Sequence, residues 1–130
     1  MSVSNHLSVA LAQIAPVWLN RDLTIKKVLA AISEAADKGA ELVTFGETLL
    51  PGYPFWLELT GGAVFNSQKQ KELHTHYLQQ AINIEDGHLQ PICDVAKQRK
   101  IAVVVGTAER ASDRGGHSIY CSLVYIDNQG

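Results

Sequence analysis

Residues 41–54 read ELVTFGETLLPGYP, an apolar run that meets a carboxylate and then breaks into a turn rich in Pro and Gly. Residues 41–45 have the apolar and β-branched side chains that are typical of a buried strand. Glu47 comes just after them. In α/β proteins, ligands bind mostly at the carboxyl ends of strands, because a strand end holds a short loop rigidly at the rim of the sheet. The stretch therefore predicts a functional carboxylate at a strand end.

The chain before this stretch predicts a strand and a helix. Residues 7–14 form a short apolar run, which is typical of a buried strand. Residues 23–38 have apolar side chains spaced by three and four, the stripe of an amphipathic helix. Asn20 or Asp22 can cap its first turn, and Gly39 can close its last. The order strand, helix, strand favours parallel pairing and hence an α/β fold.

The chain after this stretch predicts two more helices and two more strands. Ser67 and Gln70 match a capping box that begins one helix, and a second amphipathic helix covers about 89–100. Residues 101–105 are an unbroken, largely β-branched run, as expected of a strand covered on both faces. Residues 118–126 form a last strand with two largely apolar faces, so this strand also needs cover.

Composition and charge exclude several classes of protein. The 130 residues are 46% hydrophobic and 18% charged, which predicts one folded domain rather than a disordered chain. The formal charge is −2 and no basic stripe is present, so nucleic acid is not an expected partner. Residues 1–6 contain no Lys or Arg, and Gln13 interrupts the apolar stretch after them. We therefore expect neither a signal peptide nor a membrane span, and we expect a cytoplasmic protein.

The cysteines and histidines show no metal or disulfide pattern. Cys93 and Cys121 are not part of a CxxC motif, so reduced thiols are expected. Cys93 lies on the apolar stripe of a predicted helix and Cys121 within a predicted strand, which favours a structural role for both. His74 and His76 point to different faces of a helix. No metal site is expected.

The last four residues predict a turn after the final strand. Residues 127–130 read DNQG, which predicts a turn, because Asn and Gly readily take a positive φ. No returning strand follows this turn. We therefore expect the 130 residues to be part of a longer domain.

Residues 44–56, TFGETLLPGYPFW, resemble the glutamate motif of the nitrilase, or carbon-nitrogen hydrolase, superfamily. The PGYP form resembles the nitrilase and cyanide-hydrolysing branch. Residues 10–17 resemble the first strand of the family, and residues 36–43 resemble its first junction between helix and strand. Residues 105–110 and 118–123 resemble its middle strands. The resemblance thus extends over nearly the whole chain.

This resemblance implies an αββα sandwich and a Glu-Lys-Cys triad, with no metal or organic cofactor. In such a triad the Glu is the general base for a cysteine nucleophile, the Lys stabilises the tetrahedral species, and a thioimidate or acyl-enzyme forms and hydrolyses. The glutamate matches Glu47, whereas the lysine and cysteine motifs would fall beyond Gly130. Residues 1–130 are therefore expected to be the N-terminal part of a single domain and to be inactive alone. Gly46 departs from the family, which commonly has Pro there.

Several residues near Glu47 are candidates for further roles. Phe45 and Leu49 flank Glu47 and are expected to limit its solvation, as suits a general base. Tyr53 and Trp56 are candidates for substrate binding, because aromatic side chains exclude water and can contact an organic nitrile; loop packing or a subunit contact is the alternative. Glu109 and Arg110 are expected to form a surface ion pair rather than to act in catalysis.

These features predict a nitrilase that converts an organic nitrile to a carboxylic acid and ammonia. The close alternative is an amidase of the same superfamily acting on a carboxamide. A different class is a non-catalytic α/β assembly module that keeps the fold without the triad. A nucleotide-binding domain is disfavoured, because no Gly-rich phosphate loop follows a predicted strand. The expected partners are a small nitrile or amide and further copies of the same chain in a homo-oligomer.

Overall fold

A computed structural model describes residues 5–113 and 115–130. Residues 1–4 belong to the N-terminal segment for which no signal peptide is expected, and they lie outside the described residues. Four strands form one sheet in the order of the sequence. The strands are β1 (Val9–Ala12), β2 (Leu42–Phe45), β3 (Ala102–Glu109) and β4 (Tyr120–Ile126). The first three are parallel and β4 is antiparallel to β3. The predicted α/β class and the parallel pairing of the first two strands are confirmed.

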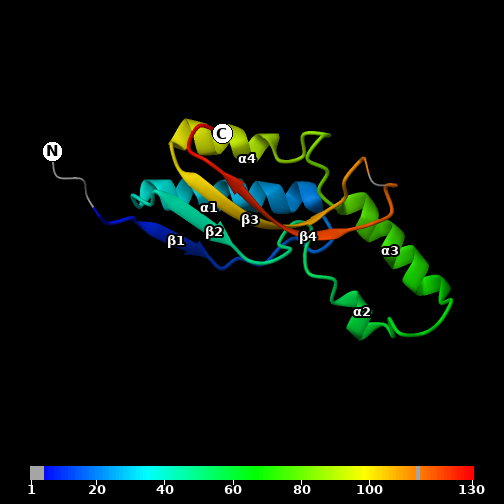
Figure 1. Cartoon of the computed structure of the whole chain (residues 1–130). Coiled ribbons are helices and arrows are strands. Elements are labelled where there is room, and N and C mark those ends of the chain that lie inside the picture. Colours follow the sequence, from blue (N-terminus) through cyan, green and yellow to red (C-terminus); the bar gives the residue numbers. More distant parts are fainter. Residues whose placement is uncertain (1–4, 114) are drawn as a thin grey trace.

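The helices lie on one face of the sheet and beyond one of its ends. They are α1 (Arg21–Asp37), the single turn α2 (Trp56–Leu59), α3 (Gln68–Gln80) and α4 (Gln90–Arg99). Helices α1 and α4 lie side by side on the same face of the sheet, whereas α2 and α3 extend away from it (Figure 1). None of the described helices combines the length and the apolar character needed to cross a bilayer.

Helix α1 has the ends that the sequence predicts. The Asn20 side chain accepts a hydrogen bond from the backbone N–H of Leu23 at 3.0 Å, which satisfies one of the free amides of the first turn. At the other end Gly39 has a φ of +82°, a conformation that costs little without a Cβ. Local sequence therefore fixes where this helix begins and ends.

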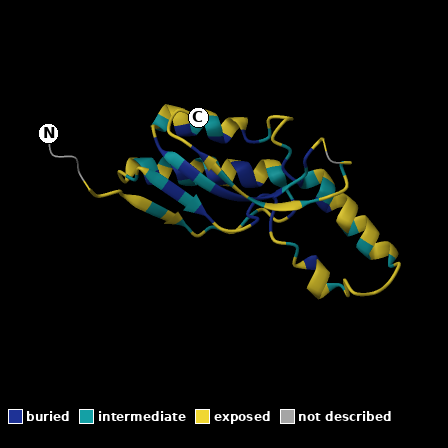
Figure 2. Cartoon of the chain, in the orientation of Figure 1, coloured by how far each residue is buried: buried dark blue, intermediate teal, exposed yellow. Residues whose placement is uncertain are grey.

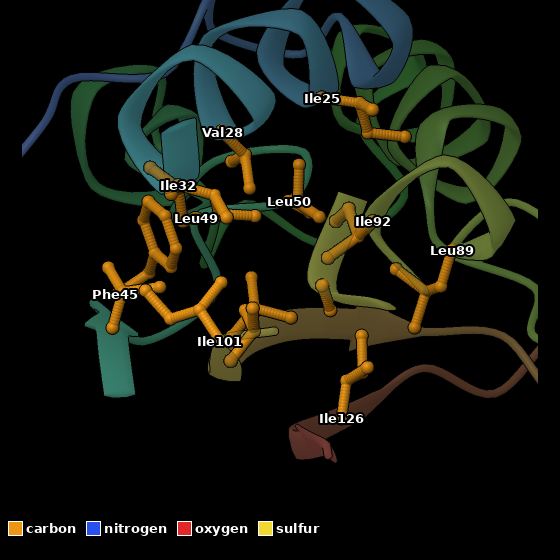
Figure 3. Packing of buried hydrophobic residues seen from close by; sticks show 14 of the residues in the cluster. Ile25, Val28, Ile32, Phe45, Leu49, Leu50, Leu89, Ile92, Ile101 and Ile126 are labelled. Carbon is orange, nitrogen blue, oxygen red and sulfur yellow. The ribbon is translucent and has the colours of Figure 1, made fainter. Parts of the chain in front are cut away.

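The main core lies between the sheet and helices α1 and α4. Figure 3 shows Ile25, Val28 and Ile32 of α1 pointing toward Phe45, Leu50 and Ile92. Val28, Ile32 and Ile92 are fully buried. Complete burial of one such aliphatic side chain stabilises a fold by about 1.5–3 kcal/mol. The predicted helical stripes are thus the surfaces that pack on the sheet.

The opposite face of the sheet is apolar and exposed, and we call it the open face. Cross-strand pairing aligns Leu11, Thr44, Val104 and Tyr125 in one row on it. Leu11 is 79% exposed and Tyr125 is 73% exposed, and Figure 2 shows exposed residues along β1 and β4. Within this chain the prediction that 101–105 is covered on both faces is therefore wrong: Val103 is buried, but Val104 is only half-buried.

Strand β3 continues beyond the predicted end at residue 105, through Gly106 to Glu109. On one side, its second half pairs with β4. On the other side, single residues from the loops complete the ladder: Ala108 donates its N–H to Leu50 O and accepts from the N–H of Ile82, both at 2.8 Å. Long-range partners, and not a local β-branched run, extend this strand.

Helix α3 is stabilised at each end by a different kind of contact. Ser67 caps its start by accepting from the Gln70 N–H at 3.4 Å, but the Gln70 side chain bonds to Thr60 and does not complete a capping box. At the other end, Arg21 donates to the carbonyls of residues 79 and 81, and Arg110 donates to that of residue 78. These two guanidinium groups compensate the partial negative charge of the helix end.

Candidate active site

Glu47 lies in the turn that leaves the carboxyl end of β2, as the sequence predicts. The turn is anchored on β3, because Leu50 donates its N–H to Gly106 O at 3.2 Å. Within the turn, Gly52 donates its N–H to Thr48 O at 3.0 Å, and the side chains of Thr48 and Leu50 are buried. The backbone of Glu47 is therefore held at the rim of the sheet.

Gly106 allows this turn to approach β3 closely. A Cβ on Gly106 would lie 2.3 Å from Gly46 O, 2.7 Å from Glu47 Cα and 2.8 Å from Thr48 N. Contacts below 3.0 Å essentially never occur at a real Cβ, and all three atoms belong to the backbone, which cannot rotate away. The lack of a side chain at Gly106 is thus a condition for the position of Glu47.

The Glu47 side chain itself is exposed, so the expectation that its neighbours limit its solvation is wrong for this chain. The reason is the direction of the neighbouring side chains. Phe45 and Leu49 are only 5% and 6% exposed and belong to the main core, so they point away from the Glu47 carboxylate. Among the described residues, no Lys, Arg or His forms an ion pair with Glu47.

A thiol lies next to the Glu47 carboxylate. Cys121 of β4 donates a hydrogen bond from Sγ to Glu47 Oε1 at 3.4 Å. This hydrogen bond, followed by burial and by the negative charge of Glu47, raises the pKa of the Cys121 thiol. No motif or spacing in the sequence indicates this pair. The register of the hairpin, which pairs Cys121 with Ala108 of β3, brings the two residues together.

The Cys121 thiol is exposed rather than buried, but its raised pKa argues against a nucleophilic role. Nucleophilic cysteines in proteins usually have a lowered pKa, because a nearby positive charge or a helix N-terminus stabilises the thiolate. The pKa of Cys121 is raised instead, by a carboxylate. Cys93 is half-buried against the main core, and burial, with a smaller effect from Asp94, raises the pKa of its thiol too. Both thiols are protonated near neutral pH and so are poor nucleophiles.

The two aromatic candidates have different surroundings. Tyr53 is 50% exposed and its ring lies 5.0 Å from that of Phe55. Trp56 is only 4% exposed and packs edge-on against Tyr77, with ring centroids 6.2 Å apart. The Trp56 ring therefore fixes the loop to α3, which is the packing alternative, and little of it is left for a ligand. Substrate binding by Tyr53 and Trp56 stays a prediction.

Glu109 and Arg110 do not form the expected ion pair, so that expectation is wrong. Ser122 donates from Oγ to Glu109 Oε2 at 2.6 Å, whereas Arg110 bonds to backbone carbonyls. The reason is that the two side chains leave β3 toward different partners.

A hollow of about 410 Å³ lies beside Cys121. Its walls are formed by Glu85, Glu109, Ala111, Asp113, Tyr120, Cys121 and Ser122.

Other possible ligand sites lie away from Glu47. A hollow of about 510 Å³ lies between the start of α1 and the end of α3, and Arg21, His88 and Arg110 are among its walls. Burial, followed by the charge of Arg21, lowers the pKa of His88. Within residues 5–113 and 115–130, no group of three His, Cys, Asp or Glu side chains is arranged to hold a metal ion.

Residues 8–130 match the carbon-nitrogen hydrolase family. The chain is 38% identical to an arylacetonitrilase of Aspergillus niger, with 100% of the chain and 35% of that protein covered. It is 36% identical to an aliphatic nitrilase of Rhodococcus rhodochrous, with 98% and 32% covered. Its fold is similar to that of an amidase from Nesterenkonia sp., with a TM-score of 0.63 at 19% identity, covering 95% of this chain and 39% of that one. The chain thus spans about a third of the length of the curated relatives that it matches.

Proposed function

Because this chain belongs to the carbon-nitrogen hydrolase family, we propose that the protein containing it is a nitrilase that converts an organic nitrile to a carboxylic acid and ammonia. Glu47 is the general base in this proposal. A cysteine nucleophile and a lysine come from the part of the relatives' length that this chain does not span. The substrate is a small organic nitrile, and no metal or organic cofactor takes part.

The main support from the structure is the way in which the turn fixes Glu47. A general base must stay within hydrogen-bond reach of the proton that it removes, so its backbone has to be positioned before the substrate binds. The turn meets this requirement through its bond from Leu50 to β3 and its close approach to Gly106. The Glu47 carboxylate is exposed at the rim, where a second group can reach it.

The proposed reaction uses this carboxylate in the first step. Glu47 accepts the proton of the nucleophilic thiol, and the sulfur attacks the nitrile carbon, while the nitrile nitrogen takes up a proton to give a thioimidate. Water adds to the thioimidate carbon and ammonia leaves, which produces a thioester. A second water hydrolyses the thioester, releases the carboxylic acid and returns the thiol. The lysine stabilises the tetrahedral species through its positive charge.

The names of the relatives favour a nitrile over an amide as the substrate. The relatives at 38% and 36% identity are an arylacetonitrilase and an aliphatic nitrilase. The likeness to the amidase is at 19% identity and concerns the fold alone. An amidase would form the same thioester directly from a carboxamide, so the two activities differ only in the substrate and the first intermediate.

Ammonia release by the complete protein tests the proposal. The purified protein is incubated with aryl-acetonitriles, aliphatic nitriles and the matching carboxamides, and Glu47→Gln is compared with Glu41→Gln. Glu41 is the matched control, since it is an exposed glutamate just before β2 whose Oε2 accepts a hydrogen bond from the Ser8 N–H. We expect Glu47→Gln to lower kcat by about 10²- to 10⁴-fold, the usual contribution of a general base, and Glu41→Gln to leave it nearly unchanged.

Each alternative predicts a different result in the same assay. Release from the carboxamides but not from the nitriles would make the protein an amidase and overturn the nitrilase proposal. No release from any substrate, with a protein that is folded by circular dichroism, would favour the assembly module. Equal activity of wild-type protein and Glu47→Gln would remove Glu47 from the mechanism.

A further inference from the structure

The contact between Cys121 and Glu47 joins a strand to a turn that lies 74 positions away in the sequence. The Cys121 thiol is the hydrogen-bond donor that the described residues supply to the Glu47 carboxylate. It binds Oε1, and no described residue donates a hydrogen bond to Oε2. Among the described residues, the carboxylate is therefore held through one oxygen, and Glu47 as a whole is exposed.

The backbone on both sides of this contact is fixed. Cys121 is paired with Ala108, two residues beyond Gly106 in β3. The turn that contains Glu47 is bound to the same strand, because Leu50 donates its N–H to Gly106 O and the lack of a Cβ on Gly106 allows the close approach. The same strand thus positions both partners, on one side through the ladder to β4 and on the other through the turn. A rotation of the Cys121 side chain can break the contact, but a shift of the backbone cannot easily do so.

We propose that Cys121 is a positioning residue for the general base: its thiol orients the Glu47 carboxylate through Oε1, so that Oε2 can accept the proton of the nucleophile. This inference rests on the proposed function. Cys121 does not touch the substrate in this role and forms no covalent bond with it. A fixed direction of Oε2 matters because proton transfer requires a short and well-aligned hydrogen bond.

Several titratable groups other than Glu47 lie near Cys121, and one of them provides a matched control. The hollow beside Cys121 contains Glu85 and Asp113 from loops, Glu109 from β3 and Tyr120 from β4. Tyr77 of α3 also interacts with the thiol electrostatically. Among these carboxylates, Glu109 is the best matched control for Glu47, because it lies on the wall of the same hollow and already accepts a hydrogen bond from Ser122.

The first test measures the contact without any need for activity. The rate of Cys121 alkylation by iodoacetamide is followed against pH in the 130-residue chain, with mass spectrometry of the Cys121 peptide. We expect Glu47→Gln to lower the pKa of the Cys121 thiol toward its ordinary value, and Glu109→Gln to leave it unchanged. The Cys93 peptide of the same sample is the internal control and should react as in the wild-type chain. An unchanged Cys121 profile in Glu47→Gln would overturn the proposal.

The second test measures the effect on catalysis in the complete protein. Cys121→Ala removes the donor, whereas Cys121→Ser keeps a donor of similar size. A hydrogen bond to a charged group is worth enough to change a rate about tenfold or more. We expect Cys121→Ala to lower kcat about tenfold with little change in KM, and Cys121→Ser to recover most of the loss. A purely structural role would affect both variants alike and would not separate kcat from KM.

The outcomes of the two tests separate this inference from the proposed function. Full kcat in Cys121→Ala, or an equal loss in both variants, would overturn the positioning role even if the enzyme is a nitrilase. A complete protein that hydrolyses neither nitriles nor amides would overturn the proposed function and, with it, the catalytic role of Cys121. In that case the alkylation profile would still decide whether Cys121 and Glu47 form the pair.

Discussion

Glu47 lies directly against Gly106, and a Cβ on Gly106 would be only 2.7 Å from the Glu47 Cα. This contact connects the candidate base to the middle of β3, which also pairs with β4 and holds Cys121 in register. The same atoms therefore determine the stability of the turn and the position of the carboxylate. A change at Gly106 should affect both properties together.

Replacement of Gly106 by Ala should destabilise the chain. The new Cβ would overlap backbone atoms of residues 46–48, which must move away, and overpacking of this kind typically costs about 1–3 kcal/mol. Gly46→Ala is the matched control, because a Cβ there meets no atom within 4 Å and the φ of Gly46 is not positive. It should be neutral or stabilise by up to about 1 kcal/mol through the unfolded state. Urea unfolding of the three proteins measures both effects, and equal midpoints for Gly106→Ala and wild type would contradict the close packing.

The stability of the chain should decline at alkaline pH in a way that depends on Tyr77. Its hydroxyl donates to Gly52 O at 3.0 Å, and burial, with smaller effects from Cys121 and Tyr53, raises the pKa of Tyr77 from 10.0 to about 12. Above pH 10 the unfolded chain loses this proton before the folded chain does. The contribution of Tyr77 to the free energy of unfolding should therefore be constant below pH 10 and should fall between pH 10 and about 12.

Urea unfolding at a series of alkaline pH values can isolate this effect. Tyr77→Phe should be less stable than wild type near neutral pH, because Gly52 O loses its donor, but its stability should fall less steeply between pH 10 and 12. Tyr125→Phe, at a position that is 73% exposed on the open face, is the control and should follow the wild-type curve. Parallel curves for wild type and Tyr77→Phe would disprove the assignment.

The open face should cause the 130-residue chain to self-associate. It exposes Leu11, Leu123 and Tyr125 on one side of a small sheet, and exposed apolar strands commonly pair or pack with other copies. The double variant Leu11→Lys, Tyr125→Lys should shift the chain toward the monomer, since a buried lysine at such a contact would be costly. The double variant Leu57→Lys, Leu59→Lys is the control, because it adds the same charge at two exposed positions of α2, away from the sheet. Light scattering at a series of protein concentrations measures the average mass of the particles, and a monodisperse wild-type monomer would contradict the prediction.

Some features of the fold and of the site could be predicted because their signals are local. The cap at Asn20, the positive φ at Gly39 and the apolar stripe of α1 all act within a few residues along the chain. The position of Glu47 after β2 is also local, because it depends only on where the apolar run ends. The expectation that this carboxylate is a general base came from the nitrilase resemblance, because no periodicity can indicate a catalytic role.

Other features were missed because they depend on which distant segments meet. Cys121 reads as a structural strand residue, and only the register of β4 on β3 places its thiol at the Glu47 carboxylate. The end of β3 was misjudged because Leu50 and Ile82 extend its ladder from loops. The edge-on packing of Trp56 against Tyr77 of α3 likewise could not be read from the sequence.

The sequence by itself therefore determined helices α1, α3 and α4, the presence of the four strands and the place of the carboxylate, since capping, periodicity and turn chemistry act over one or two turns of chain. The tertiary structure decided what surrounds that carboxylate. Gly106 and Cys121 reach Glu47 through strand pairing, and hydrogen bonds across a sheet join residues whose separation in the sequence leaves no local trace.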